Sequence, residues 1–366
     1  MNLLSQITVI ILNWNGWSDT IECLDSLYRI NYALFDTVVV DNGSVDDSVN
    51  RIKQYCLGKK AEGCSSEQFA ETREGSLIQV LEYTYHQTSA GVPEYTLSNL
   101  GGAHSKTKLY LLDCDKNYGF AEGNNIALRF ALENLSSDYF LLLNNDTVVD
   151  SSFLLPLVQF AESHPDAGAL GSKVLFYAEP TKIQSAGVLV KKNIFNYLGL
   201  KAIDVADFIS RGFAEKDLGQ YNEICSVPSL IGCCILLRKD VIKACGLLDA
   251  SFFLYHEESD WMYRIRKQGY SLYYIPESKI WHKYSASSGG RFNPKVVYFC
   301  TRNSVFFAQK HNTKVSYALL ILWYLVYVHM TKIVLYLLIE RQPRLLLMFY
   351  RGLFDGILRI SQQIKT

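Results

Sequence analysis

The sequence predicts an α/β protein organised around a central, mostly parallel sheet. Three apolar runs, at residues 7–12, 37–40 and 141–143, each stop abruptly at polar side chains. Runs without polar alternation are typical of strands that are buried on both faces between layers of helices. Segments with helical spacing follow the first two runs, and strands that alternate with helices favour a parallel sheet.

The remaining elements are expected in chain order around these strands. Apolar residues recur at helical spacing over residues 21–28, and a turn with capping side chains precedes a second helix after residue 44. Residues 57–108 lose this periodicity and are interpreted as a surface insertion, in which residues 77–85 fit either a helix or a strand. Further strands are expected at residues 109–112, 168–174, 229–238 and 273–276.

The composition narrows the class of protein. The 366 residues include 36 Lys plus Arg and 36 Asp plus Glu, so a nucleic-acid binder with a basic surface is not indicated. The nine cysteines include no C-x-x-C pair, which argues against a zinc site and against a disulfide framework. The cysteines fit better as buried thiols in a reducing compartment. Because no leader pattern is recognised before Asn13, the catalytic part is expected in the cytoplasm.

Residues 311–366 differ in kind from residues 1–310, and we expect them to form a separate C-terminal unit of helices. From residue 310 onward the sequence contains eight Lys and Arg but only two acidic residues, and residues 317–328 are all apolar. This apolar run is too short to span a bilayer. A packed helix pair is one interpretation, but the flanking basic residues and the Trp and Tyr content favour amphipathic helices on an anionic membrane face.

Polar side chains follow the buried strands where ligands bind in open α/β sheets. Asp41 ends one strand, with Asn13 and Asn15 beside it after another, and it can accept hydrogen bonds from a base or a ribose. Asp146 follows residues 141–143 and can hold Mg²⁺ or Mn²⁺ on a substrate diphosphate. An aspartate in this place can also serve only as a turn former or a helix cap.

Glu257 and Glu258 open a helix that Gly269 ends, and either can act as a general base. Burial of Glu258 beside neighbouring aromatic residues would raise its basicity. Both could instead only interact favourably with a helix N-terminus. The carboxylates thus offer a nucleotide contact, a cation ligand and a base, which sugar transfer from a nucleotide diphosphate requires.

Gly119 and Gly123 lie in a turn that feeds another helix. Glycine permits close approach of the backbone to a ligand, and a helix N-terminus there can face an anion. The segment matches neither the G-x-G-x-x-G pattern nor a P-loop. Asn124 and Asn125 are candidates for donor contacts, or only residues of the first helical turns.

Seven ordered blocks resemble the inverting family 2 glycosyltransferases of the GT-A fold, and among them the rhamnosyltransferase-like enzymes of bacterial surface polysaccharide assembly. The resemblance covers about residues 7–310 and implies a single nucleotide-diphospho-sugar transferase domain. The blocks are VIILNWNG, VVVDNGSVDDS, NYGFAEGNN, LLLNNDT, GCCILLR, FFLYHEESDWMYR and WHKYSASSGG.

The resemblance implies a nucleotide contact at Asp41, a metal ligand at Asp146 and the base at Glu258, with Glu257 as its rival. Asn144 stands where the family's metal motif usually has an acidic residue, so weaker or water-mediated metal binding is expected. The base is commonly an aspartate in the family, which leaves the choice between the two glutamates open.

Three further residues of these blocks are expected in the site. Asn117 and Asn145 are expected to bind the nucleotide sugar. His282 matches a histidine found near the diphosphate or the metal, although it could be only a packed core histidine.

The sequence therefore predicts a glycosyltransferase on the cytoplasmic face of the membrane. It would move a sugar, rhamnose if the resemblance extends so far, to a hydroxyl of a glycan or lipid-linked acceptor with inversion. A sugar nucleotidyltransferase would need a glycine-rich basic loop after the first strand, and NWNG does not supply one. A non-catalytic nucleotide-sugar-binding protein is the third interpretation.

Overall fold

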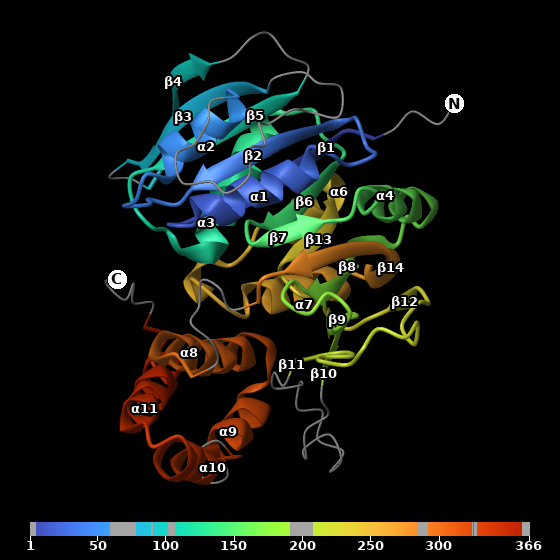
Figure 1. Cartoon of the computed structure of the whole chain (residues 1–366). Coiled ribbons are helices and arrows are strands. Elements are labelled where there is room, and N and C mark those ends of the chain that lie inside the picture. The colour runs from blue at the N-terminus through green and yellow to red at the C-terminus, as the bar shows by residue number, and fades with distance from the viewer. Residues whose placement is uncertain are drawn as a thin grey trace.

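In the computed structural model the described residues are 5–58, 78–88, 91–101, 107–190, 208–284, 292–323, 325 and 328–360. One large mixed sheet carries helices on both faces, and a group of C-terminal helices lies to one side of it (Figure 1). Over the described ranges the strand order is β12-β14-β8-β13-β6-β1-β2-β5-β3-β4, with β7 on β14 and β9 on β8.

The elements that precede the middle of the chain build the first half of the sheet. Their bounds are β1 Ile7–Asn13, α1 Trp17–Leu27, β2 Phe35–Asp41, α2 Ser48–Cys56, β3 Gln79–Gln87, β4 Pro93–Gly101, β5 Lys108–Cys114, α3 Gly119–Asn134, β6 Tyr139–Asn144, β7 Thr147–Val149 and α4 Leu154–Ser163.

The later elements complete the sheet and form the C-terminal helices. Their bounds are β8 Ala167–Phe176, β9 Ile183–Ser185, β10 Val188–Val190, β11 Phe208–Ser210, β12 Cys225–Ser226, β13 Cys234–Arg238, α6 Lys239–Cys245, the 3₁₀ helix η1 Ala250–Phe252, α7 Glu257–Lys267, β14 Ser271–His282, α8 Pro294–His311, α9 Lys314–Trp323, α10 His329–Ile333, the π-helix η3 Val334–Ile339 and α11 Pro343–Ile357.

The pairing directions bring the ends of seven strands to one edge. β1 lies between β2 and β6 and is parallel to both, β5 is parallel to β2, and β3 is parallel to β5. β13 is antiparallel to β6 and to β8, and β8 is parallel to β14. Two antiparallel steps restore the direction, so β1, β2, β3, β5, β6, β8 and β14 all end at the same edge of the sheet.

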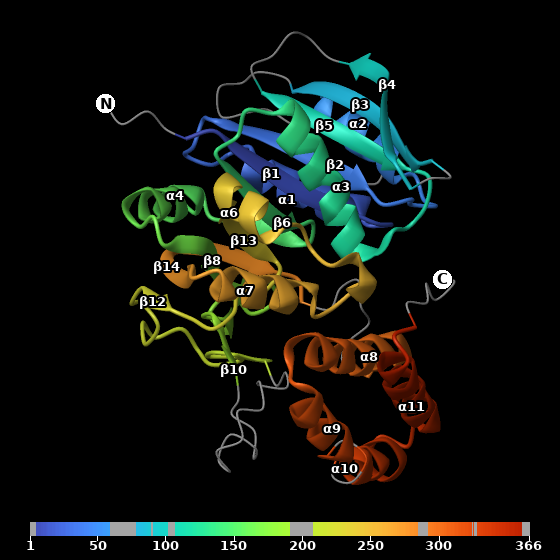
Figure 2. The same ribbon diagram turned by 180° about the vertical axis from the view of Figure 1, so that it is seen from behind.

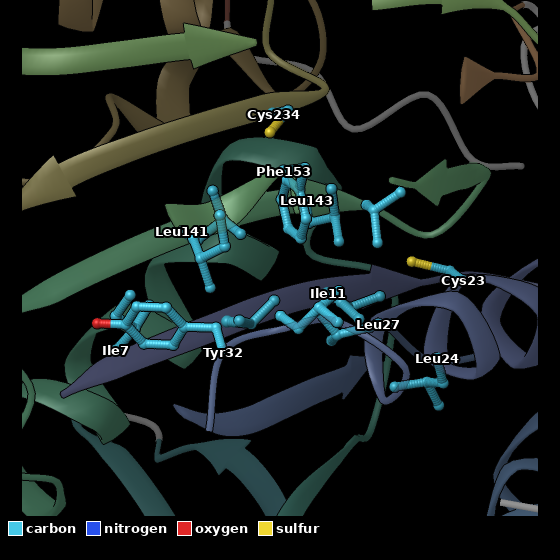
Figure 3. Close-up of a cluster of buried hydrophobic side chains, with 14 of the residues drawn as sticks. Ile7, Ile11, Cys23, Leu24, Leu27, Tyr32, Leu141, Leu143, Phe153 and Cys234 are labelled. Atoms are coloured by element: carbon cyan, nitrogen blue, oxygen red, sulfur yellow. The ribbon is translucent and has the colours of Figure 1, made fainter. Parts of the chain in front are cut away.

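Alternate side chains of the buried strands point into two separate cores. Ile11 and Leu143 pack with Leu24 of α1 on one face, which α2 and α4 also cover (Figure 3). Ile10 and Leu142 pack on the opposite face, under α3, α6 and α7, which Figure 2 shows from behind. Because both faces are covered, these strands are apolar at nearly every position, as the sequence indicates.

The segment expected as a surface insertion contributes two strands to the sheet. β3 is parallel to β5, and β4 is antiparallel to β3 at the edge. Tyr85 is buried and its neighbour Thr84 exposed, which is the alternation of a strand. Of residues 77–85, which fit either a helix or a strand by sequence, those from Gln79 onward form a strand, while residues 59–77, 89–90 and 102–106 lie outside the described part.

The C-terminal helices pack around a small core of their own. α8 lies against α11, and Val297, Tyr336, Leu345 and Phe349 form the centre of this group. The boundary expected after residue 310 falls one residue before the end of α8, which also contacts η1. Across the described ranges, no single helix combines the length and the apolar character needed to cross a bilayer.

Candidate active site

Four strands of the sheet end in a polar side chain at the shared edge; β6, β1 and β2 are adjacent, and β14 is separated from β6 by β8 and β13. Asn13 ends β1, Asp41 ends β2, Asn144 ends β6 and His282 ends β14. Asp146 follows β6 by two residues. The strand order thus brings together candidates that lie up to 269 positions apart in the chain.

Asp41 is buried, with 1% of its surface exposed, and it organises the turn after β2. Its Oδ2 accepts hydrogen bonds from Asn13 Nδ2 at 2.6 Å and Ser44 Oγ at 2.8 Å, and its Oδ1 accepts one from Ser44 N at 2.8 Å. Burial raises the pKa of Asp41, although these bonds oppose the rise. One acceptor position on Oδ1 remains for a ligand.

A chain of hydrogen bonds links this aspartate to the strand that carries Asp146. Thr20 Oγ1 donates to Asn13 Oδ1 at 2.8 Å, and Asn145 Nδ2 donates to Thr20 Oγ1 at 3.0 Å. Asn15 is exposed, and its Oδ1 accepts from Val45 N at 2.8 Å. Asn13, Asn15, Asp41 and Asn145 therefore belong to one polar network, in which Asn15 faces solvent.

Gly119 occupies a different role from the one expected. A Cβ on this residue, whose φ is +85°, would lie 2.4 Å from the ring of Phe253, so the glycine makes room for that side chain. The first amide groups of α3 are also engaged, because Phe120 N donates to Phe253 O at 2.7 Å. In this structure the start of α3 thus meets a carbonyl group in place of an anion.

Asn117 and Asn124 also bond inside the protein. Asn117 Oδ1 accepts from Gly119 N at 2.8 Å and from Asn42 Nδ2 at 3.1 Å, which fixes the turn before α3. Asn124 is 2% exposed and donates to Phe120 O one helical turn earlier, at 2.9 Å. The geometry of Asn124 fits the interpretation as a helix residue, and Asn117 remains partly exposed at the edge.

Asp146 and His282 face each other at the end of β6. His282 Nε2 lies 3.1 Å from Asp146 Oδ1, an atom that is buried and has no hydrogen-bond partner. His282 Nδ1 lies 3.0 Å from Gln184 Oε1. A proton on Nδ1 satisfies that bond and leaves Nε2 unprotonated, 3.5 Å from Asn144 Nδ2, so the buried Asp146 Oδ1 receives no hydrogen bond from the ring.

A divalent cation fits this pair. Two ligands at adjacent corners of an octahedron lie about 3 Å apart when the bonds are about 2.1 Å long, and a ligand histidine usually donates its second ring N–H to an acceptor such as Gln184. No group of three or more His, Cys, Asp and Glu side chains gathers for a metal in the described part of the chain. Mg²⁺ commonly takes its other ligands from water and substrate phosphates.

Glu257 and Glu258 are adjacent residues at the start of α7, and their carboxyl groups influence each other electrostatically. Burial raises the pKa of both carboxyl groups, and the charge of Glu258 raises that of Glu257 further, well above its ordinary value. Glu257 is 4% exposed, whereas Glu258 is partly exposed and lies over Gly232, 3.5 Å from an added Cβ. Glu257 is therefore the more deeply buried carboxyl group of the pair, and Glu258 is the more exposed one.

The glutamate pair and Asp146 converge on the start of β13. The negative charges of Asp146 and Glu258 both add to the rise that burial causes in the pKa of the Cys233 thiol. Cys233 O in turn accepts from Asn144 N at 2.9 Å. Cys233 therefore lies within electrostatic range of the candidate cation ligand and of the candidate base.

The sequence analysis leaves out three residues of this edge. Asp113 lies opposite Asp41 on β5, partly exposed, and burial together with the charge of Asp41 raises its pKa. As the first polar residue after a buried run, it satisfies the rule that selects Asp41. Asn42 and Gln184 act only through other side chains, and no local pattern distinguishes them.

The chain matches two descriptions of one family. Residues 94–301, more than half of the chain, match "Glycosyltransferase like family 2", and residues 8–68 match "Glycosyl transferase family 2". The two matches together include the ends of six of the seven strands of the shared edge; β3 lies between the two matched ranges.

Two curated relatives are similar over about half of this chain. A low-salt glycan biosynthesis hexosyltransferase of Haloferax volcanii is 23% identical over 168 residues, which are 46% of this chain and 50% of that protein. An O-antigen biosynthesis protein of Myxococcus xanthus is 28% identical over 195 residues, 52% of this chain and 14% of that protein. The chain thus spans half or less of the length of each.

Solved structures with a similar fold include two that contain Mn²⁺. GalNAc-T7 with UDP, GalNAc and Mn²⁺ has a TM-score of 0.53 at 13% identity, over 84% of this chain and 48% of that one. A mannosyltransferase of Pyrobaculum calidifontis with GDP-Man and Mn²⁺ has a TM-score of 0.50 at 13% identity, over 98% and 87%. At this identity the likeness shows the fold, which is a GT-A-like α/β fold with a mixed, mostly parallel sheet.

Proposed function

Because the chain belongs to glycosyltransferase family 2, we propose that it transfers a sugar from a nucleotide diphosphate donor to a hydroxyl of a growing glycan. One observation carries this proposal: the facing pair Asp146–His282 and the pair Glu257–Glu258 lie around Cys233 at one edge of the sheet. A cation ligand and a base at one edge are what such a transfer needs.

Each pair has its own task in the proposed reaction. Asp146 and His282 would hold Mg²⁺ or Mn²⁺, which when bound supplies positive charge to the leaving diphosphate. Glu258 takes the proton of the acceptor hydroxyl as its oxygen bonds to the anomeric carbon, and the bond from that carbon to the diphosphate oxygen breaks. A single in-line displacement of this kind inverts the anomeric centre.

Donor recognition is assigned to the network around Asp41. The free acceptor position on Asp41 Oδ1 supports contact with an N–H of the base or a ribose hydroxyl, and the exposed Asn15 and Trp14 lie beside it. Asn117 and Asn145 would act at the two ends of this region. We assign no donor contact to Gly119 and Asn124, because Phe253 and Phe120 occupy their free positions.

A binding and turnover screen tests the proposal. The purified chain is heated with UDP, dTDP and GDP, each with and without Mn²⁺, and then incubated with nucleotide sugars of the same bases, dTDP-rhamnose included. We expect one nucleotide to raise the Tm by about 5–10 °C at saturation, more so with Mn²⁺, and its sugar to release nucleoside diphosphate. Binding without turnover of any donor would instead favour a non-catalytic binding protein.

The C-terminal helices are proposed to lie on the cytoplasmic face of an anionic membrane, next to a lipid-linked acceptor. α11 buries Leu345 and Phe349 against its neighbours, yet Leu347 and Phe354 on its other side are each 61% exposed. Val315, Leu322, Met330, Ile339 and Leu358 add to this apolar surface. An exposed apolar helix face accompanied by Lys and Arg is typical of interfacial binding.

Vesicle flotation tests this membrane proposal. We expect the full chain to float with vesicles that contain phosphatidylserine, and to float less with phosphatidylcholine alone or at high salt. Leu347→Asp combined with Phe354→Asp should abolish flotation, while Leu218→Asp, at a leucine that is 78% exposed on the catalytic part, should leave it intact. If the double variant floats as well as the Leu218→Asp variant, the membrane proposal is wrong.

A further inference from the structure

The segment that leads into the glutamate pair has a strained backbone. Phe253 has φ 62° and ψ −55°, in a tight turn closed by Leu254 N donating to Phe252 O at 2.7 Å. Tyr255 and His256 follow with φ 68° and 70°. These three side chains disfavour left-handed conformations, and such backbones persist only where the surroundings hold them. Glu257 comes directly after this segment.

α8 supplies the groups that hold it. Asn303 Nδ2 donates to the carbonyl oxygens of Phe252 at 2.9 Å, Leu254 at 2.7 Å and Tyr255 at 2.7 Å. Arg302 Nη2 donates to Phe252 O at 2.7 Å and Ser251 O at 3.0 Å. Two adjacent side chains thus bind four carbonyl groups of residues 251–255. The strained backbone deprives these carbonyl groups of the partners that they would have in a regular helix or strand.

The two side chains act as one buried unit. Arg302 and Asn303 are each 0% exposed, and Arg302 Nε donates to Asn303 Oδ1 at 2.9 Å, which fixes the orientation of the amide. The rings of Phe299 and Phe306 lie 5.0 and 5.1 Å from the guanidinium carbon. A buried cation with this many carbonyl and aromatic contacts is held in one geometry.

The same helix reaches the glutamates themselves. The charges of Glu258 and Glu257 contribute to the raised pKa of the thiol of Cys300, which lies on α8 one turn before Asn303. From the opposite side, Phe253 O accepts from the start of α3. The strained segment is therefore fixed between α3 and α8, with the glutamate pair immediately beyond it.

We propose that Arg302 and Asn303 are positioning residues, which bind the carbonyl groups of residues 251–255 and so hold the positive-φ backbone of Phe253, Tyr255 and His256 that directs Glu257 and Glu258 to the edge of the sheet. The inference rests on the proposed function, because positioning has a measurable consequence only if Glu258 reacts. It makes α8 a working part of the transferase and not only the start of a membrane appendage.

α11 supports α8 at this point. A Cβ on Gly356 would lie 2.9 Å from Arg302 O, and one on Gly352 would lie 3.2 Å from Arg302 N. The two glycines allow the helices to approach closely where the positioning residues sit. Tyr298 OH also donates to Asp355 Oδ2 at 2.7 Å across the same contact.

Steady-state kinetics of Asn303→Ala test the proposal in the full chain. We expect kcat to fall about 10²-fold, as for a reacting group displaced by about 1 Å, while the Tm shift produced by the nucleotide that binds the wild-type chain is unchanged. Tyr298→Phe is the matched control, because it removes one buried hydrogen bond from α8 without touching residues 251–255. Because the Tyr298 ring contacts Arg302, a second control lies far from α8: Thr8→Val removes the buried hydrogen bond between Thr8 Oγ1 and Ser137 Oγ near the start of β1, and its kcat should match the wild type.

A double-variant cycle separates positioning from general damage to the fold. If Asn303 acts through Glu258, adding Asn303→Ala to Glu258→Gln should lower kcat by less than threefold, since the group being positioned is already disabled. Unchanged kcat in Asn303→Ala, or a full further loss in the double variant, overturns the inference. If the wild-type chain turns over no donor, the proposed function is wrong, and the inference that rests on it is wrong as well.

Discussion

The two halves of the sheet edge treat their carboxylates differently. In the half made by β1 and β2, Asp41 accepts three hydrogen bonds from Asn13 and Ser44. In the half around β6 and α7, the buried atoms Asp146 Oδ1, Glu257 Oε2 and Glu258 Oε2 have no hydrogen-bond partner. Unpartnered buried oxygens are costly in a low-dielectric interior. The first half therefore satisfies most of its carboxylate with protein donors, whereas the second leaves buried carboxylate oxygens unpaired.

The largest effect that this comparison predicts is in the second half, at Glu258. Glu258→Gln removes the accessible carboxylate, so kcat should fall by about 10³-fold or more, within the range of general-base variants. Glu257→Gln keeps a side-chain N–H that can donate to Glu258, and should retain most of the activity. Initial-rate assays of both variants test this assignment. A larger loss of kcat in Glu257→Gln than in Glu258→Gln would assign the base to Glu257.

Loss of the carboxylate should impair metal binding and activity at Asp146, whereas at Asp41 it should lower the stability of the fold. Asp146→Asn should abolish the Mn²⁺-dependent part of the nucleotide Tm shift and lower kcat about 10²-fold, while costing little stability, because its Oδ1 has no partner to lose. Asp41→Ala should destabilise the fold by about 1–3 kcal/mol through unsatisfied buried donors. Urea unfolding with and without Mn²⁺ measures both, and equal stability losses would contradict the comparison.

The smallest predicted effect concerns pH. Burial and the charge of Glu258 raise the pKa of Glu257 in the folded state. Protonated Glu257 therefore contributes stability that is fully present below the unfolded pKa of about 4.3. This contribution is lost as the pH rises through the pKa of Glu257 in the folded state. Glu257→Gln should therefore raise the Tm at pH 7, by about 2–4 °C per kcal/mol, and lose this advantage near pH 4. Thermal unfolding across that interval tests the sign.

The sequence locates the edge of the sheet because a simple rule applies there. Asp41 and Asp146 each follow an apolar run, and such runs become parallel strands with their ends together, whereas His282 is predicted only through the family resemblance. The same rule applies to Asp113. The alternation in residues 79–87 is weaker, because Val80, Leu81 and Glu82 all lose most of their exposure where β3 pairs with two neighbours.

What the sequence does not reveal are contacts between distant segments. Gly119 matches the pattern for close approach of a ligand, but the ring that approaches it belongs to Phe253, 134 positions later. Gln184 and Asn303 lie in stretches without a recognisable motif, and their roles follow only from the packing of β9 and α8. Local patterns specify strand ends, and tertiary contacts specify which side chain fills each space.

Cys233 beneath the two candidate pairs gives the molecule a chemical reporter. Burial keeps this thiol protonated at neutral pH, so an alkylating reagent reacts with it only when the surrounding structure opens. Burial raises the pKa of Cys23 and of Cys56 to about 12; Cys23 lies on α1 beside Asn144 and Thr147, and Cys56 lies on α2. The order in which these thiols become modified during unfolding would record, residue by residue, which layer of the enzyme gives way first.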